Sequence, residues 1–228
     1  MPRPLPLTLF DLDHTLLDGD TDILWCDFLV ERGTIDREHF GAENQRLERE
    51  YRAGTVSAQV FSEFYVSTLA GHTRAHWEPV RREFLDTVIA PRIGRAAHDL
   101  VERHRSAGEL VVLTTATNRF LAELTAAHLG LPHLIATECE MGGDGHFTGR
   151  IAGSLNMRDG KVTRLLEWLA LQRMDLHDCE STFYSDSIND LPLLSAVRHP
   201  VVVNPDLRLA AVAAERGWPV LQLRDLAS

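Results

Sequence analysis

The sequence has little of what marks a membrane, secreted or nucleic-acid-binding protein. No apolar run approaches the roughly 18 residues needed to cross a bilayer, and Met1 to Pro6 lack the apolar stretch of a secretory signal. Acidic residues outnumber basic ones 33 to 23, and the formal net charge is −10. This balance disfavours a nucleic acid or an anionic membrane as partner. We therefore expect a cytoplasmic protein.

Cysteine is also scarce, and two other metal or phosphate motifs are incomplete. Cys26, Cys139 and Cys179 are odd in number and show no C-x-x-C spacing, which indicates reduced, mostly packed thiols. The Gly-rich turn at 142–145 is not followed by G-K-[ST], so it is not a phosphate loop. His72 and His76 are four residues apart, but no third metal ligand lies near them in the sequence.

The chain does contain a regular alternation of short apolar runs and amphipathic stretches. Strands are predicted over 5–10, 110–114, 134–137, 182–184, 201–203 and 220–223. Helices are predicted over 94–106, 119–129, 162–171, 190–196 and 207–216. Such alternation predicts an α/β fold, a doubly wound parallel sheet with helices on both faces.

Two segments interrupt this alternation. Residues 17–90 have a helical pattern, with four stretches that open at Asp20 or Thr21, Asp36, Ser57 and Thr73, and we interpret them as a helical cap. Residues 138–152 contain the Gly-rich turn between two strand-like runs and predict a β-hairpin flap. The predicted division is a core of 1–16 and 91–228 with a cap of 17–90, a size that 228 residues allow.

Two carboxylates and a hydroxyl follow the first apolar run, in Asp11-Leu12-Asp13-His14-Thr15. Ligands of an open α/β sheet gather outside the carboxyl ends of its strands, so these acids are expected to face a crevice. Asp11 can attack a phosphoryl group and form an aspartyl-phosphate. A phosphate ester is itself negative, so a bound cation is needed, and Mg²⁺ suits a few oxygen ligands plus water. Asp13 can offer its main-chain carbonyl to the ion and its side chain as general acid and base.

Polar side chains also follow the second apolar run. The run 110–113 ends in two threonines, and the Thr115 hydroxyl is a candidate donor to the phosphoryl oxygens. Asn118 is predicted to cap the helix that follows. Because a helix N-terminus favours anions, we also expect Asn118 to take part in substrate binding.

The last two elements supply a cation and two more acids. Lys161, at the head of a predicted helix, is a candidate for the fixed positive charge that phosphoryl transfer needs. Asp186 and Asp190 follow the apolar run that ends at Tyr184. We expect Asp186 to be a side-chain ligand of Mg²⁺ opposite Asp11, and Asp190 to orient Lys161 and the water molecules on the metal.

Together these elements resemble the motifs of the haloacid dehalogenase superfamily. Asp11-x-Asp13-x-Thr15 resembles its first motif, Thr115 its second, Lys161 its third and Asp186-x-x-x-Asp190 its fourth. The resemblance covers nearly the whole chain, and it is nearest to the phosphoserine-phosphatase-like subgroup with a helical cap inserted after the first motif. The dehalogenases lack the second acid of the first motif, so Asp13 favours the phosphatase and phosphotransferase branches.

The predicted function is Mg²⁺-dependent hydrolysis of a small phosphorylated metabolite through an aspartyl-phosphate. A phosphomutase or other phosphotransferase with a sugar-phosphate acceptor is a second enzymatic interpretation, and a non-catalytic binding protein is a third. A binding module has no need for both Asp11 and Asp13, which weighs against the last. The sequence does not specify the oligomeric state.

Departures from the phosphoserine pattern bear on the substrate. Phosphoserine phosphatases carry a Gly-Gly pair after the second motif and a cap arginine that pairs with the substrate carboxylate. This chain has Ala116-Thr117 instead, and Arg49 and Arg52 are only loose candidates for that arginine. A buried carboxylate without its partner is costly, so phosphoserine is the alternative substrate and not the preferred one.

An acidic residue favours a substrate with an amine. Asp20, nine residues after Asp11, matches the position of the acidic group that such enzymes use for the substrate amine. Residues 17–90 contain 8 Arg, no Lys and 14 Asp plus Glu, a net charge of 8 − 14 = −6. We expect an amino-alcohol phosphate such as histidinol phosphate, with Trp25 or Phe64 stacking on its imidazole.

Overall fold

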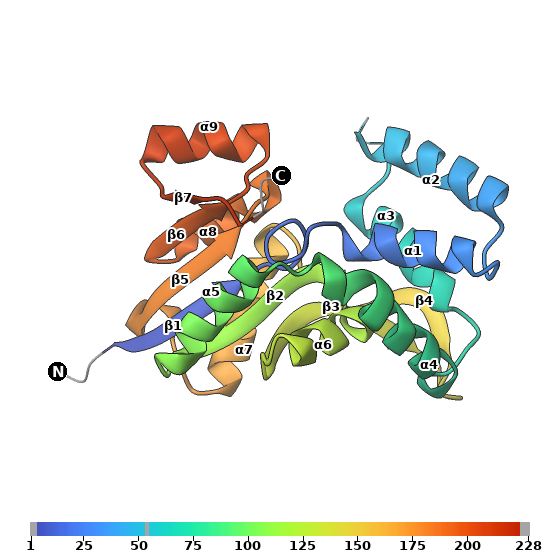
Figure 1. Cartoon of the computed structure of the whole chain (residues 1–228), viewed down its shortest axis with the longest axis horizontal. Helices are drawn as coiled ribbons and strands as arrows, with labels where there is room; N and C mark the ends of the chain where they lie inside the picture. Colours follow the sequence, from blue (N-terminus) through green and yellow to red (C-terminus); the bar gives the residue numbers. More distant parts are fainter. Residues whose placement is uncertain (1–3, 53–54, 224–228) are drawn as a thin grey trace.

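The computed structural model describes residues 4–52 and 55–223. Within these ranges a seven-stranded sheet has the order β4-β3-β2-β1-β5-β6-β7 (Figure 1). All neighbouring strands are parallel except β3 and β4. The strands are β1 (Leu5–Phe10), β2 (Leu110–Asn118), β3 (His133–Met141), β4 (Phe147–Ala152), β5 (Cys179–Ser185), β6 (His199–Val203) and β7 (Val220–Leu221). The predicted α/β fold is confirmed. Because β1 lies between β2 and β5, the segments that follow these three parallel strands lie together at their carboxyl ends.

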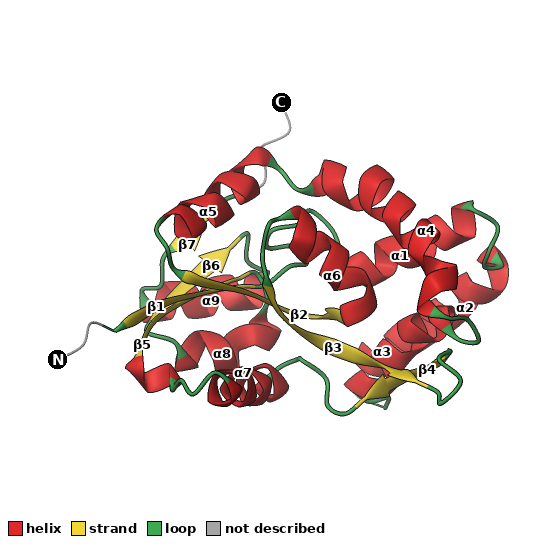
Figure 2. Ribbon diagram, turned by 90° about the horizontal axis from the view of Figure 1, so that it is seen from below, coloured by secondary structure: helices red, strands yellow, loops and turns green. Residues whose placement is uncertain are grey.

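Helices cover both faces of this sheet (Figure 2). They are α5 (Arg95–Ser106), α6 (Arg119–His128), α7 (Asp159–Leu171), α8 (Leu191–Ala196) and α9 (Leu207–Arg216). Side chains of a strand point alternately to the two faces. Accordingly, Leu7 and Leu9 of β1 pack in the cluster that contains the buried leucines of α7 and α8, whereas Phe10 packs in the cluster of α5 and α6. All three are fully buried, and each such side chain contributes about 1.5–3 kcal/mol through removal from water.

Four further helices come between β1 and β2, as the sequence predicts. They are α1 (Thr21–Glu31), α2 (Arg37–Arg52), α3 (Ala58–Val66) and α4 (Arg74–Phe84), the last continued by a π-helical turn, Leu85–Ile89. All four predicted openings are confirmed, because the side chains of Asp20, Asp36, Ser57 and Thr73 accept hydrogen bonds from main-chain N–H groups three residues on. These caps satisfy donors that the first turn of a helix leaves free.

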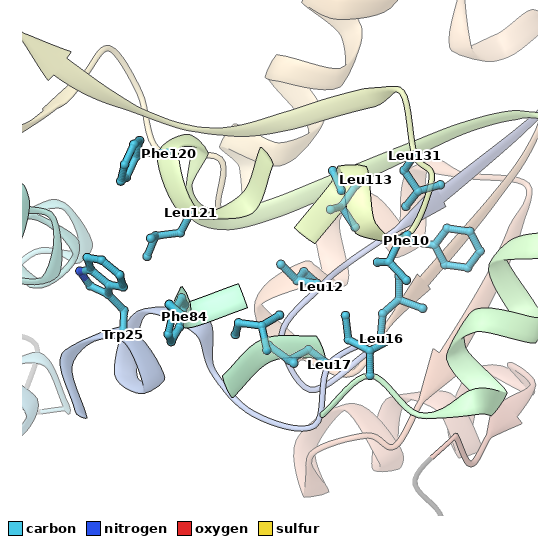
Figure 3. Packing of buried hydrophobic residues seen from close by; sticks show 14 of the residues in the cluster. Phe10, Leu12, Leu16, Leu17, Trp25, Phe84, Leu113, Phe120, Leu121 and Leu131 are labelled. Atoms are coloured by element: carbon cyan, nitrogen blue, oxygen red, sulfur yellow. The ribbon is translucent and has the colours of Figure 1, made fainter. Parts of the chain in front are cut away.

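The helices α1 and α4 share a hydrophobic core with the face of the sheet that α5 and α6 cover. Trp25 of α1 and Phe84 of α4 pack edge to face, with ring centroids 5.2 Å apart. Both belong to the cluster that includes Phe120 and Leu121 of α6, and Leu17 joins this aromatic group to the segment after β1 (Figure 3). The independence of 17–90 as a domain stays a prediction.

The predicted hairpin is present as β3 and β4, and it packs against the helices of 17–90. Phe147 donates its N–H to the His72 carbonyl and accepts from Gly71, both at 2.9 Å. Gly149 has a φ of +83°, and a Cβ there would lie 3.2 Å from the Cα of Ser67. Glycine is therefore required at 149, both by the conformation and by the close approach of the helical segment.

Several element boundaries differ from the prediction, and two of these differences bear on the site. The second strand, expected to end at 114, extends to Asn118 with a break in its register on β3 after Thr115. The helix expected to begin at 162 begins at Asp159, which places Lys161 in its first turn. Among the described residues no helix is long and apolar enough to span a bilayer. The three cysteines are free thiols, as predicted, and Cys26 and Cys179 are buried.

Candidate active site

The first acid of the site lies where β1 ends. Asp11 donates its main-chain N–H to the Tyr184 carbonyl of β5 at 3.0 Å, so the segment leaves the sheet beside the neighbouring strand. The Asp11 side chain is buried, with 6% of the residue exposed. Asp186 follows β5 directly, and the structure therefore brings together acids that are 175 residues apart in the sequence.

A buried ammonium joins Asp11 to Asp190. Lys161 Nζ lies 2.7 Å from Asp11 Oδ1 and 2.7 and 2.8 Å from the two carboxylate oxygens of Asp190. Lys161 is the only lysine of the chain and is 2% exposed. Burial lowers the pKa of Lys161, but the charges of Asp11 and Asp190 outweigh it and the net pKa is raised. The residue is therefore a permanent cation in this site.

The turn before Lys161 is tightly constrained. A Cβ on Gly160 would lie 2.3 Å from the Leu155 carbonyl oxygen, so only glycine fits there. Arg158 has a φ of +54°, a conformation that non-glycine residues adopt rarely. Ser185 donates to Asp190 Oδ2 at 2.7 Å and fixes the second carboxylate.

Thr15 connects Asp11, which follows β1, with Asp186, which follows β5. Its Oγ1 lies 3.2 Å from both Asp11 Oδ2 and Asp186 Oδ1, and it accepts the Asp186 N–H at 3.1 Å. A hydroxyl has one hydrogen, so it cannot satisfy both carboxylates. Burial, with the charge of Asp190, raises the pKa of Asp186 to about 7. Burial also raises the pKa of Asp11, and the Lys161 ammonium only partly opposes this.

These acids supply negative charge and oxygen ligands of the kind that a hard cation binds. Asp11, Asp186 and the main-chain carbonyl of Asp13 offer oxygen atoms only, which suits Mg²⁺ because it keeps several water ligands. No three His, Cys, Asp or Glu side chains form a metal cluster in the part of the chain that the structure describes. The expected set instead combines two carboxylates with one main-chain carbonyl, and these oxygen donors fit Mg²⁺ because it keeps water for its remaining ligands. The rings of His72 and His76 stack at a centroid distance of 4.0 Å.

Asp13 is held mainly by the hydroxyls of Thr21 and Thr117, which were not among the predicted site residues. Its Oδ1 accepts from the Thr21 N–H at 2.8 Å and from the Thr21 hydroxyl at 2.5 Å. Its Oδ2 accepts from the Thr117 hydroxyl at 2.5 Å and more weakly from Thr115 at 3.4 Å. Thr21 occupies the first turn of α1, so this helix fixes the orientation of Asp13. The only sequence signal was the density of threonines beside two recognised positions, Asp20 and Thr115.

The acids surround a cavity of about 140 Å³. Asp20 is one of its walls. Burial first and the charge of Asp13 second raise the pKa of Asp20 to about 6, although Asp20 accepts main-chain hydrogen bonds as the cap of α1. The lining residues are Asp11, Asp13, His14, Asp20, Ala116, Met157, Lys161, Asp186, Ser187, Asn189 and Asp190.

Two predicted substrate contacts have other partners in this structure. Asn118 Oδ1 accepts the Leu121 N–H at 3.1 Å, which confirms the predicted cap, and its Nδ2 donates to Asp22 at 2.9 Å. Trp25 is 1% exposed and donates to Thr68, so its predicted stacking on a substrate ring is wrong: an aromatic stripe on a helix indicates burial but not which neighbour it meets.

Phe64 and Arg49 are not among the described residues that line the cavity. Phe64 stacks on Phe40 with ring centroids 4.6 Å apart. Arg49 is exposed on α2, and the side chain of Arg52 lies outside the described residues.

The chain is an α/β protein with a buried carboxylate–lysine centre at the carboxyl ends of its central strands, and comparison with known proteins shows that it is a hydrolase and identifies its family. The model of haloacid dehalogenase-like hydrolases matches residues 8–195. The chain therefore belongs to the haloacid dehalogenase-like hydrolases, and the predicted resemblance is confirmed.

Two relatives along most of the chain are named as phosphatases. A histidinol-phosphatase of Neisseria meningitidis serogroup C (strain 8013) is 37% identical over 96% of this chain and 99% of its own length. A phosphoserine phosphatase of Mycobacterium tuberculosis (strain ATCC 25618 / H37Rv) is 34% identical over 97% of this chain and 73% of its own length. The prediction of a phosphatase is thereby confirmed.

Among solved structures, a protein of unknown function from Bordetella pertussis Tohama I is 43% identical with a TM-score of 0.93, covering 97% of this chain and 100% of its own. A phosphoserine phosphatase with substrate bound has a TM-score of 0.64 at 18% identity, over 92% of this chain and 90% of its own, and shares the fold.

Proposed function

We propose that this protein is a Mg²⁺-dependent phosphomonoesterase that forms an aspartyl-phosphate on Asp11. The observation that supports it best is the arrangement around Asp11. The buried ammonium of Lys161 lies 2.7 Å from this carboxylate. A second carboxylate, that of Asp13, lines the same cavity and accepts hydrogen bonds from the Thr21 and Thr117 hydroxyls. One acid is thus restrained as a nucleophile and the other is positioned for proton transfer.

In the first step the Asp11 carboxylate attacks phosphorus. The new bond forms as the ester P–O bond breaks, and Asp13 protonates the departing alcohol oxygen. In the second step Asp13 takes a proton from water, which attacks the same phosphorus, releases inorganic phosphate and restores Asp11. Lys161 keeps Asp11 oriented and offsets the charge that accumulates on the phosphoryl oxygens.

The cation proposed for the site adds charge that Lys161 alone does not supply. When bound by Asp11, Asp186 and the Asp13 carbonyl, Mg²⁺ would neutralise the phosphate and reduce its repulsion of the attacking carboxylate. Thr115 and Asn118 remain proposed contributors, Thr115 as a hydroxyl beside Asp13 and Asn118 through the N-terminus of α6 that it caps.

For the substrate we propose an amino-alcohol phosphate, with histidinol phosphate as the first candidate. Asp20 lines the cavity, and a substrate ammonium beside it would favour its ionised form. Among the described residues that line the cavity, Lys161 is the only Lys or Arg, and it is already shared by two carboxylates, so a substrate carboxylate would lack a free cation there. The similarity to the meningococcal histidinol-phosphatase along nearly its whole length supports this choice, whereas the mycobacterial relative supports phosphoserine as the alternative.

The test compares three substrates, in the wild type and in a variant that lacks the charge of Asp20. With Mg²⁺ present, kcat/KM is measured for histidinol phosphate, phosphoserine and nitrophenyl phosphate in the wild type and in Asp20→Asn, which keeps the helix cap. We expect histidinol phosphate to be preferred, and its KM to rise about tenfold in the variant while that of nitrophenyl phosphate changes less than threefold. Asp27→Asn, an exposed position on the same helix, is the matched control. A preference for phosphoserine, or equal effects on both esters, would contradict the substrate assignment.

A further inference from the structure

A buried asparagine outside the recognised motifs joins two parts of the site. Asn156 is fully buried and lies in the loop between β4 and α7, five residues before Lys161. Its Nδ2 lies 2.9 Å from the Thr115 carbonyl oxygen and 3.0 Å from that of Ile135. Its main-chain N–H donates to Thr137 Oγ1 at 3.1 Å. The loop is therefore fastened to both β2 and β3.

These contacts require a donor at Asn156. The two carbonyl oxygens of Thr115 and Ile135 only accept, so the NH₂ end of the side chain must face them, and its third contact is Thr114 Oγ1 at 3.0 Å. Asn156 Oδ1, at the other end, is buried without a hydrogen-bond partner among the described residues. A buried acceptor left unpaired costs free energy. The donated bonds are thus what this residue contributes, at the expense of an unsatisfied oxygen.

The Thr115 carbonyl belongs to the peptide that forms a wall of the cavity. The register pairs Thr115 with Ala136 and then Asn118 with Thr137, so Ala116 and Thr117 bulge out of the ladder. In a planar trans peptide the N–H points opposite to the C=O. Since the Thr115 carbonyl points to Asn156 and Ala116 lines the cavity, the contact with Asn156 also sets the direction of the Ala116 N–H.

The same anchor acts on Lys161 through a short, constrained segment. Gly160 donates its N–H to the Met157 carbonyl at 3.0 Å, and Lys161 donates its own to Arg158 at 3.1 Å. The close contact of Gly160 with the Leu155 carbonyl removes further freedom. Displacement of Asn156 is therefore transmitted to the first turn of α7.

We propose that Asn156 is a positioning residue for phosphoryl transfer. It holds the Thr115–Ala116 peptide and the Lys161 turn in one arrangement, so that the Ala116 N–H and the Lys161 ammonium act together on the phosphoryl group at Asp11. This inference rests on the phosphatase function proposed above. A misplacement of about 1 Å costs about a hundredfold in rate, so the effect falls on kcat.

The first test is Asn156→Asp in the full-length protein with Mg²⁺. The shape is kept, but an acceptor replaces the donor that faces the Thr115 and Ile135 carbonyls. We expect kcat for nitrophenyl phosphate to fall about 10- to 100-fold, with KM within about threefold of wild type. The control is Asn44→Asp, since Asn44 accepts from the Tyr65 hydroxyl through its oxygen, which the substitution keeps, and kcat should stay within twofold.

A second measurement begins with the wild type, so its first part does not depend on the folding of that variant. In ¹⁵N-alanine-labelled wild type, the Ala116 amide signal, identified by its loss in Ala116→Gly, should shift on titration with inorganic phosphate and Mg²⁺. In Asn156→Asp that shift should be lost. A folded Asn156→Asp with wild-type kcat, or an Ala116 signal that ignores saturating phosphate in an active wild type, overturns the inference. A wild type that hydrolyses no phosphate ester overturns the proposed function instead.

Discussion

Lys161 Nζ and Asp11 Oδ1 lie 2.7 Å apart across 150 residues of sequence, and both groups are buried. The ammonium is shared with Asp190, so one cation balances two carboxylates. Each carboxylate has been removed from water at a cost that this cation offsets, together with hydrogen bonds from the Thr15 and Ser185 hydroxyls. The contact therefore contributes to the stability of the fold as well as to the chemistry of Asp11.

Replacement of Lys161 by Met should show both contributions. Removal of the partner leaves two buried carboxylates uncompensated, and we expect the free energy of unfolding to fall by about 3–5 kcal/mol at pH 8, with hydrolysis lost. The pKa of Asp11 is already raised by burial, and without Lys161 it rises further. The folded state then binds protons that the unfolded state has released, so the deficit should shrink as pH falls toward 5.

Urea unfolding at pH 8 and pH 5.5 measures this difference. If Lys161→Met had the same free energy of unfolding as the wild type at pH 8, the ion pair would contribute nothing to the stability of the fold.

Replacement of Asp11 by Asn tests the nucleophile. The amide has nearly the same shape and can still accept from Lys161, but it neither attacks phosphorus nor binds Mg²⁺ well. Activity should fall below about a thousandth of wild type, as for loss of a covalent nucleophile, while the thermal midpoint stays or rises. Phosphate release and thermal unfolding are the measurements, and an Asn variant with full activity would end this mechanism.

Replacement of Thr117 by Val tests the support of Asp13. The variant removes the 2.5 Å hydrogen bond to Asp13 Oδ2 without a change of volume. An alkyl ester needs a proton on its leaving oxygen and nitrophenolate does not, so kcat should fall about tenfold more for the alkyl ester. Thr163→Val, at an exposed position whose hydroxyl donates to the Asp159 carbonyl of its own helix, is the control. An equal loss for the two esters would place Thr117 outside proton transfer.

The sequence alone predicted the parts of this site that depend on local pattern. The helix at 207–216 has the predicted bounds because Asp206 caps its start and Gly217, with a φ of +66°, ends it. Asp11 and Asp186 lie at the carboxyl ends of β1 and β5, as predicted, because each directly follows a strand that has a buried apolar run near its end. Topology then brings such strand ends together.

The contacts that orient these acids were not predictable in the same way. The bonds from Thr21 and Thr117 to Asp13, and from Asn156 to Thr115, join segments whose separation in the sequence carries no periodic signal. The extension of β2 past Thr115 depends on a bulge that pairing with β3 creates. The buried position of Trp25 follows from its packing on Phe84 and Trp77, which no pattern within α1 specifies.

Calcium should inhibit the enzyme. Ca²⁺ takes more oxygen ligands at longer distances than Mg²⁺, so it should compete for Asp11 and Asp186 without preserving the alignment of Asp11 for attack. We expect turnover with equal concentrations of both ions to fall severalfold and to recover with excess Mg²⁺. Removal of metal with a chelator should abolish activity. Undiminished turnover in excess chelator would show that the acidic cluster has another purpose.

The ionised form of Asp20 should destabilise the folded state, and a substitution that removes this charge should raise the free energy of unfolding. Burial and the charge of Asp13 raise its pKa to about 6, well above the 3.8 of an ordinary aspartate. Between these values the folded state holds a proton that the unfolded state has released, so stability decreases as pH rises from about 4 to 6. Asp20→Asn removes the charge and keeps the cap of α1. We expect it to raise the free energy of unfolding by about 1–2 kcal/mol at pH 7.5 and by almost nothing at pH 4, where wild-type Asp20 is protonated in the folded state. Urea unfolding at the two pH values, with Asp27→Asn as control, measures the gain, and a gain of equal size at both would show that charge at Asp20 is not its cause.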